Sequence, residues 1–518
     1  MENSSSSHPK FSFWVGVCFT LNYVVGSGFL TLPWAFYQTG ALLGVLVLAI
    51  FSFCSILATW FILEASVRAT RLLECDSDVE MRKVGDRRNY EAINTDTSSE
   101  QIDATDNVIL MSDNSIHNSG EGPCNKVDES NSSRNTKSRR IEMTEMCELF
   151  LGPNGRRIFS YLIGIYMYGT LWAYCTVFAK AFAVQFALNG ETNPEDGLTY
   201  YIYLFIFAFL VVPLSLMELS EQIYIQVTLT LFRGVMLGVM LFSIGYAYFS
   251  CGEEFGSMSN LSCKADYVAD ASTEPNTLVA VHFDKLYLFL PIAAYAYIFH
   301  HSVPGLSEPV EDKKSLNTLF VAALLIAFVG YAILGVCVSA YFGDKVQSSS
   351  NLDWQNFRGT RNMDGSAPWY ASIVACFVVL FPALDVASAY PLNAFTLGNN
   401  LMSAFYGEDM HLHEKSRFKT SVFRLLAAVP PFIGACVVSE LGSITSFTGL
   451  TGFAIAFVVP ALLAKYSAIR MRELGLPVDT IHSSSLTNMT TQYGMTIAGC
   501  LLILVVVISQ IVNGTSNR

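Results

Sequence analysis

Long apolar runs dominate the chain, and polar stretches separate them. Runs of about 17–25 apolar residues are long enough to cross the hydrocarbon core of a bilayer as helices. The pattern predicts about eleven such helices and hence an all-α polytopic membrane protein. The expected helices are Phe13–Tyr37, Ala41–Val67, Ile158–Leu188, Tyr201–Leu216, Tyr224–Phe249, Leu286–Val303, Leu316–Phe342, Tyr370–Met402, Val422–Val438, Ile444–Ala464 and Tyr493–Val512.

The first apolar segment contains residues that break helices. Asn22 is followed by Gly26, Ser27 and Gly28, and Pro33 comes shortly afterwards. Inside a helix, glycine costs about 1 kcal/mol and proline about 3 kcal/mol relative to alanine. In a bilayer such a break is tolerated only where it lines a cavity or is buried in protein. We therefore predict an unwound stretch here, as in the substrate sites of many secondary transporters.

The sixth segment is interrupted in a similar way. His300, His301 and Ser302 precede Pro304 in an otherwise apolar span. Because this break comes five helices after the first, two five-helix halves would cross the membrane in opposite directions. That order predicts a five-plus-five inverted repeat followed by one C-terminal helix, with a binding site between the two breaks. The alternative is that the sixth segment simply ends in a polar turn at His300.

Composition and charge agree with a membrane protein. The chain has 518 residues, of which 52% are hydrophobic and 14% charged, whereas soluble domains have about 25% charged residues. Short basic clusters fall on one side if the N-terminus is cytosolic, as the positive-inside rule requires. These clusters are Lys313–Lys314, Lys415–Lys419 and Arg470–Arg472. The C-terminus is then expected outside, and we expect no cleaved signal peptide.

The polar segments define the remaining organisation. Residues 69–143 are rich in Ser, Asn, Asp and Glu and poor in aromatic residues, which predicts a disordered cytosolic loop. Cys251 and Cys263 share an outer loop and are expected to form a disulfide. Asn260 in the same loop is an expected glycosylation site. The predicted parts are a cytosolic tail (1–12), helices 1–2 (13–68), the loop (69–143), helices 3–11 (144–512, with outer loop 251–285) and an outer tail (513–518).

Several motifs together resemble the amino acid/auxin permease family, part of the amino acid–polyamine–organocation group, and within it a branch of orphan members. The motifs cover nearly all the predicted helices and are Val25–Pro33, Ile165–Gly169, His301–Val310, Leu380–Pro382 with Pro391 and Leu397–Asn400, Phe447–Gly449 and Val459–Ala461. The resemblance implies a LeuT-like fold of eleven helices and an amino acid permease role. It implies no particular substrate.

The first break is expected to hold the substrate. Amide groups at the start of the second half-helix carry partial positive charge and suit a carboxylate, while glycine lets a ligand approach the backbone. The alternative for the two glycines is close helix packing. The predicted substrate-binding residues are Gly26, Ser27, Gly28, Thr31, Tyr295 and Tyr297.

Ionisable residues inside spans are functional candidates. Asp385 in the eighth segment is expected to couple transport to H⁺ or Na⁺ together with Asn22 and Ser388. The alternative is that Asp385 forms a structural pair with Lys180 or Arg424. The predicted gating or pH-sensing residues are His300, His301 and Arg233. Arg233 is expected to form a gate pair with Glu218 or Glu221. The alternative is that the Arg233 side chain snorkels towards the membrane interface. Each histidine is alternatively a hydrogen-bonded structural residue.

The sequence therefore predicts a secondary amino acid transporter that works by alternating access. The alternative is a non-transporting sensor or scaffold that signals through residues 69–143. We expect no enzymatic activity, no metal or other cofactor beyond a coupling H⁺ or Na⁺, and no nucleic-acid partner. The expected partners are a small-molecule substrate, membrane lipid and a cytosolic protein bound by the 69–143 loop. The expected location is the endolysosomal, vacuolar or plasma membrane.

Overall fold

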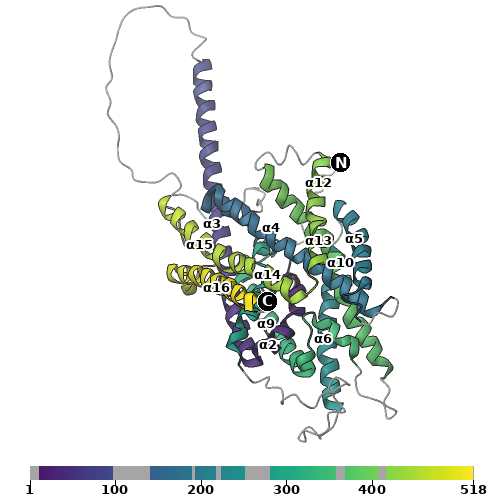
Figure 1. Cartoon of the computed structure of the whole chain (residues 1–518). Helices are drawn as coiled ribbons and strands as arrows, with labels where there is room; N and C mark the ends of the chain where they lie inside the picture. The colour runs from purple at the N-terminus through teal and green to yellow at the C-terminus, as the bar shows by residue number, and fades with distance from the viewer. Residues whose placement is uncertain are drawn as a thin grey trace, which may run out of the picture.

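The computed structural model describes residues 11–96, 141–188, 193–217, 223–250, 281–357, 368–406 and 416–516. All helices of the described ranges belong to one helical body, from which the end of α3 projects (Figure 1). The longer helices are α1 (Phe13–Val24), α2 (Leu32–Thr39), α3 (Ala41–Asp96), α4 (Met143–Gln185), α5 (Leu198–Leu216), α6 (Ile223–Ser250), α7 (Leu286–Ala296), α9 (Leu316–Phe342), α10 (Trp369–Tyr406), α12 (Arg417–Ala428), α13 (Pro430–Val437), α14 (Leu441–Phe453), α15 (Val459–Glu473) and α16 (Met489–Ser516).

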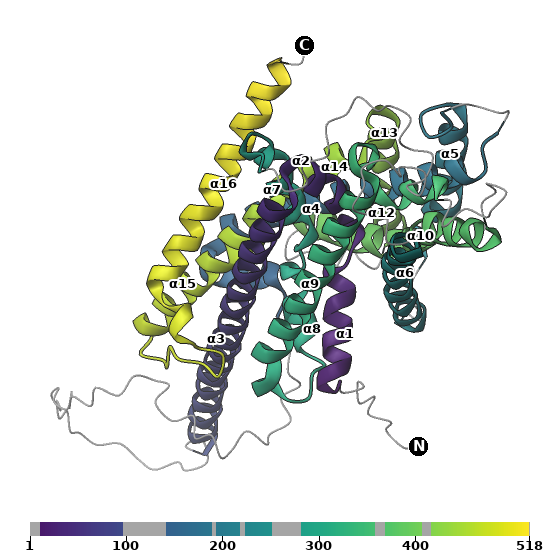
Figure 2. The ribbon, with the colours of Figure 1, turned by 90° about the horizontal axis from the view of Figure 1, so that it is seen from below.

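The predicted fold class, an all-α polytopic membrane protein, is confirmed. Within the described ranges, nine helices are long and apolar enough to cross a membrane, and two shorter apolar helices cover Phe13–Val24 and Leu231–Tyr246. Together they match the eleven predicted segments in order. Figure 2 places the start of α1 and the projecting end of α3 at one end of the body and the end of α16 at the other, as an odd number of crossings requires.

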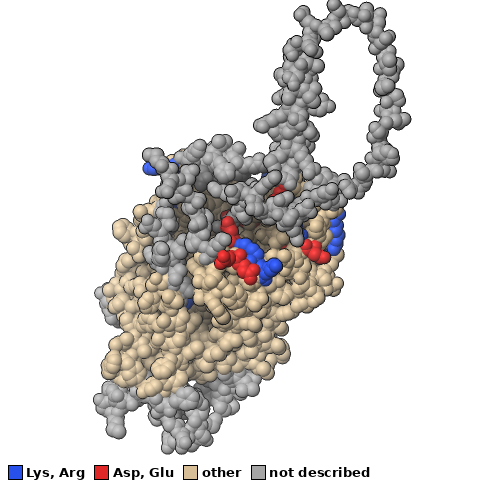
Figure 3. All heavy atoms as spheres, turned by 180° about the vertical axis from the view of Figure 1, so that it is seen from behind, with Lys and Arg blue, Asp and Glu red and all other residues tan. Residues whose placement is uncertain are grey.

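The surface of the body is suited to lipid. Phe205, Phe209 and Phe242 lie on α5 and α6 with at least 74% of their surface exposed. Figure 3 shows a broad face without acidic or basic side chains, with the charged ones gathered towards the end from which α3 projects. Since large apolar side chains are rarely so exposed in water, these faces are expected to meet acyl chains.

Two predicted boundaries are wrong. The loop prediction for residues 69–143 fails over 69–96, because α3 continues to Asp96. The reason is local, since this stretch contains many strong helix formers such as Leu, Glu, Arg and Lys. The third predicted span begins too late, because α4 starts at Met143 and bends at Gly152 (φ 76°), directly before Pro153. Residues 97–140 of the predicted loop lie outside the described residues.

A buried polar cluster joins α3 to the connection between α15 and α16. The Arg68 guanidinium donates to the Glu64 carboxylate at 2.9 Å and to the Val478 carbonyl at 3.0 Å. The Thr487 hydroxyl donates to the same carboxylate at 2.6 Å. Both charged side chains are at most 3% exposed. The pair is therefore satisfied inside the protein, as a buried ion pair must be, and it fixes the base of α3.

Candidate functional site

The first helix unwinds where its sequence predicts. After α1 ends at Val24, the chain has no helical turn until the short 3₁₀ helix η1 (Ser27–Leu30), which leads into α2. The Gly26 amide donates back to the Val24 carbonyl at 2.9 Å. A Cβ atom built on Gly26 would meet nothing within 4 Å. Gly26 therefore faces open space, and the close-packing alternative does not apply to it.

The second break lies directly against the first. Helix α7 ends at Ala296, and the chain becomes helical again at η5 (His300–Ser302) and α8 (Val303–Ser307). The alternative of a plain terminal turn at His300 is wrong, because the unwinding starts before that residue. A Cβ atom on Gly28 would lie 3.0 Å from the Ala296 Cα, so close packing does explain this glycine. The Ser27 and Tyr295 hydroxyls are 3.1 Å apart.

A tyrosine that sequence analysis missed connects the two breaks. Tyr331 lies on α9, is 2% exposed and contributes one hydroxyl group. That hydroxyl lies 2.9 Å from the Val24 carbonyl and 3.2 Å from the Ala296 carbonyl. Both carbonyls end a helix and lack their usual partners. Tyr331 therefore stabilises both unwound segments at once. Nothing in its apolar surroundings along the chain distinguishes it from an ordinary core tyrosine.

We expect Tyr331→Phe to destabilise the protein by about 1–3 kcal/mol, because the Ala296 carbonyl loses its donor and the Val24 carbonyl keeps only the hydrogen bond from the Gly26 amide. The midpoint of thermal unfolding in detergent measures this. Tyr297→Phe is the matched control, since the Tyr297 ring packs on Tyr331 at 5.6 Å between centroids but its hydroxyl has no hydrogen-bond partner among the described residues. An equal loss in both variants would contradict the role assigned to the Tyr331 hydroxyl.

An ion pair holds the first break from the other side. The Arg233 guanidinium on α6 donates to both carboxylate oxygens of Asp385 on α10, at 2.6 Å and 2.8 Å. Its Nη1 also donates to the Asn22 carbonyl and the Asn22 side-chain oxygen, each at 3.0 Å, and to the Val25 carbonyl. One guanidinium therefore satisfies the carbonyls that α1 leaves free and neutralises the carboxylate of α10.

The ion pair corrects three sequence-based expectations. Asp385 does have a structural partner, but it is neither Lys180, which lies 3.4 Å from Asp196, nor Arg424, which donates to the Leu216 carbonyl. The Ser388 hydroxyl donates to the Asp385 carbonyl of its own helix at 2.8 Å. The snorkelling alternative for Arg233 is wrong, because the ion pair with Asp385 holds this side chain inside the body. Its predicted partners Glu218 and Glu221 lie outside the described residues.

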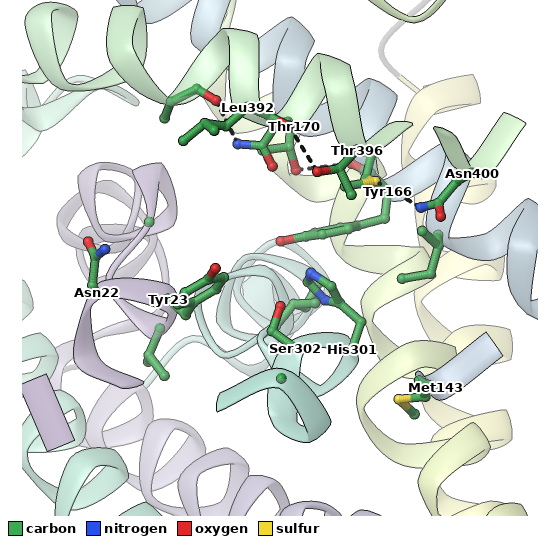
Figure 4. Close-up of a pocket in the computed structure, with 18 of the residues that line it drawn as sticks. Asn22, Tyr23, Met143, Tyr166, Thr170, His301, Ser302, Leu392, Thr396 and Asn400 are labelled. Carbon is green, nitrogen blue, oxygen red and sulfur yellow. Dashed lines mark hydrogen bonds between the residues drawn. The ribbon is translucent and has the colours of Figure 1, made fainter. Parts of the chain in front are cut away.

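A cavity of about 510 Å³ lies between the two breaks, α4 and α10. The helix breaks, Arg233 and the residues Glu142 and Met143 at the start of α4 line it. Of the lining residues, Tyr23, Glu142 and Thr396 are exposed. Figure 4 shows Asn22 and Tyr23 across an open space from Thr396 and Asn400. Other lining residues from these elements are Gly26, Ser27, Gly28, Tyr166, Met167, Thr170, Tyr174, Tyr295, Ile298, His301, Ser302 and Asn393.

The two histidines have different surroundings. His301 lines the cavity, with its ring 5.6 Å from the Tyr166 ring between centroids, and both side chains are labelled in Figure 4. His300 is 0% exposed and its Nε2 lies 3.2 Å from the Ser55 carbonyl on α3. His300 therefore matches the structural alternative, while His301 is the one that a ligand in the cavity would reach.

Of the remaining predicted site residues, some line the cavity and others do not. Asn22 lines the cavity as well as binding Arg233. Thr31 and Tyr297, both 0% exposed, are not among the residues that line the cavity, so the expectation that they contact a ligand is not met by this geometry. The predicted disulfide of Cys251 with Cys263 and the predicted glycosylation of Asn260 lie outside the described residues.

Comparison with known proteins agrees with these features. Residues 9–73 and 127–511 match the family described as "Transmembrane amino acid transporter protein". A Dictyostelium discoideum protein, Transmembrane protein 104 homolog, is 27% identical over 479 residues, which cover 90% of this chain and 91% of that protein. Human Transmembrane protein 104 is 25% identical over 486 residues, which cover 88% of this chain and 87% of the human protein.

Among solved structures, a mutant of the manganese transporter of Eremococcus coleocola is similar to this chain with a TM-score of 0.45 and 10% identity. The aligned region covers 98% of this chain and 96% of that structure.

Proposed function

The chain belongs to the transmembrane amino acid transporter family, and we propose that it is a secondary amino acid transporter that works by alternating access. The observation that carries the proposal is the cavity of about 510 Å³ that ends at two helix breaks in contact with each other. Its volume falls in the range of about 300–1,000 Å³ that is common for small-molecule sites. Broken helices facing a cavity at the middle of a bundle are how many secondary transporters bind substrate.

The substrate carboxylate is proposed to bind beside Gly26 and Ser27. The amides at the start of η1 carry the partial positive charge of a helix N-terminus, which continues through α2. Gly26 has open space where a side chain would be, so a ligand can approach the backbone. The substrate ammonium group is proposed to face the break in the other helix near Ile298, which also lines the cavity.

Coupling to H⁺ rather than Na⁺ is proposed from the position of Arg233. A sodium ion between α1 and α10 would need the oxygens of Asn22, Val25 and Asp385 as ligands. The Arg233 guanidinium already donates hydrogen bonds to all of these oxygens. A second cation there would be repelled at short range. We therefore propose sodium-independent transport, with proton exchange within the cavity.

We propose that the cavity opens beside Glu142 and Thr396, which line it and are exposed, on the side of the predicted cytosolic segments. This conformation is proposed to be the inward-facing one. Release of substrate towards the cytosol, and closure of the opposite side, follow from this assignment under alternating access.

The test is uptake of radiolabelled amino acids by proteoliposomes that contain the full chain, with and without a pH gradient. We expect flux that a pH gradient drives and that sodium does not change. Gly26→Leu should reduce flux at least tenfold by filling the cavity, because this site has room for a side chain. Gly238→Leu is the control, since Gly238 on α6 also faces open space but lies outside the residues that line the cavity.

No flux for any amino acid in well-folded wild-type protein would overturn the proposal. Flux that is equal in wild type and Gly26→Leu would instead contradict the assignment of the substrate to this cavity.

A further inference from the structure

The connection between α9 and α10 is buried to an unusual degree. It contains the 3₁₀ helix η8 (Ser350–Asn356). Leu352, Trp354 and Phe357 are each at most 2% exposed, whereas connecting segments normally run over the surface. We refer to residues 349–357 as the plug.

The plug contacts three helices of the bundle, and on α4 it lies at the opposite end from Glu142 and Met143. The Trp354 indole donates to the Ser243 hydroxyl on α6 at 3.0 Å, and the Asn351 amide donates to the Val379 carbonyl on α10 at 3.1 Å. The Gln355 amide lies 3.5 Å from the carbonyl of Val184, which is near the C-terminal end of α4. The plug therefore holds α4, α6 and α10 together at this end of the bundle.

A single acidic residue lies inside the plug. Asp353 is 2% exposed. Its Oδ1 accepts a hydrogen bond from the backbone amide of Gln347 at 2.9 Å. Its Oδ2 has no hydrogen-bond partner among the described residues. The Ser350 hydroxyl is also buried without a partner there, and residues three apart in a 3₁₀ helix lie on the same side. A carboxylate in this position would be a buried and largely uncompensated charge, which is costly.

Among the described residues, no hydrogen bond or ion pair from a charged side chain reaches the Asp353 carboxylate. Asp344 and Lys345 in the same connection are exposed. Lys180 on α4 is paired with Asp196. The rings of Tyr246 on α6 and Tyr370 on α10 meet edge to face, with centroids 5.9 Å apart. Burial raises the pKa of Asp353 well above its ordinary value, and the hydrogen bond from the Gln347 amide opposes this rise.

We propose that Asp353 is a proton-binding site that holds the plug in its closed position, so that loss of this proton releases the plug and opens the bundle on that side. The proposal concerns a step that any substrate would need, and it does not depend on which substrate is carried.

The direction of the pH effect follows from the two positions of the side chain. In the released plug Asp353 is exposed, with an ordinary pKa of about 3.9, whereas in the closed plug its pKa is raised. Protonation therefore favours the closed plug. This stabilisation is complete below about pH 3.9 and is lost as the pH rises through the raised pKa of the closed state. Opening is expected to increase from acidic to neutral and alkaline pH.

The test is hydrogen–deuterium exchange of the full chain in lipid nanodiscs, followed by mass spectrometry on peptides that cover residues 346–357. Exchange is compared at about pH 5 and about pH 8 after correction for the intrinsic rate. In the wild type we expect opening of the plug to increase at least about tenfold at the higher pH, because the closed plug binds the proton more tightly than the released plug. In Asp353→Asn, which cannot ionise, we expect no such increase.

Asp344→Asn is the matched control, because it removes an exposed acid from the same connection and should behave like the wild type. Protection of peptides from α9 and α10 against exchange reports whether each variant is folded. If Asp353→Asn is not folded, Asp353→Ser is used in its place. A pH response that persists in the folded neutral variant, or that is absent from the wild type, would overturn the proposal.

Discussion

Replacing Arg233 by glutamine is expected to reduce transport by at least about 100-fold. The substitution removes the donor that binds both Asp385 oxygens and the carbonyls of Asn22 and Val25. Breaking a buried ion pair by removing one partner costs about 3–5 kcal/mol, because the remaining charge is uncompensated. A loss of about 3 kcal/mol corresponds to about a 100-fold change in an equilibrium constant. Initial rates of uptake in proteoliposomes measure the effect.

Two further variants separate charge from geometry at this site. Arg233→Lys keeps the positive charge but lacks the planar fork that binds two carboxylate oxygens, so we expect only partial transport. Arg233→Gln combined with Asp385→Asn removes both charges, and it should be more stable than either single variant. If the double variant instead lost as much stability as the two single variants together, the pair would not be coupled as the distances indicate.

The same variants test the proposed coupling. If the guanidinium takes the place of a sodium ion, removing it leaves the Asp385 carboxylate and the carbonyls of Asn22 and Val25 free. Oxygen atoms of this kind are ligands for hard cations. Any residual transport by Arg233→Gln should then become dependent on sodium, while that of the wild type should not.

The fold could be predicted from the sequence largely because each span is a local property. The length of each apolar run determines where a membrane-spanning helix forms. The run Gly26–Gly28 interrupts the first helix through its own low helix propensity. The contact of the two breaks also followed from the chain order of the helices. The end of α3 was not predicted, because a polar stretch that cannot build a core can still be helical when it continues a helix already formed.

The pairing of side chains could not be predicted in the same way. Arg233 and Asp385 are 152 positions apart, and the sequence pattern suggested Lys180 or Arg424, not Arg233, as the partner of Asp385. Which cation is used depends on the rotation of α6 about its axis, which is set by packing. Tyr331 was missed for a related reason, because a hydroxyl that serves two backbone carbonyls leaves no pattern in the sequence.

The second large effect is expected at Gly449, where α14 meets the broken sixth helix. A Cβ atom on Gly449 would lie 1.9 Å from the carbonyl oxygen of Pro291 on α7 and 2.5 Å from its carbonyl carbon. Both are backbone atoms, which cannot move aside as the end of a flexible side chain can. Small residues at such crossings let membrane helices approach closely. Gly449→Ala should therefore force α14 away from α7.

We expect Gly449→Ala to destabilise the protein by about 3 kcal/mol, at the upper end of the usual cost of overpacking, and to lower the midpoint of thermal unfolding in detergent. Gly330→Ala is the control, since Gly330 lies within the membrane helix α9 but a Cβ atom there meets nothing within 4 Å. Alanine is also the better helix former, so this control should be as stable as the wild type or more so. A Gly449→Ala variant as stable as Gly330→Ala would mean that α14 does not contact the carbonyl of Pro291.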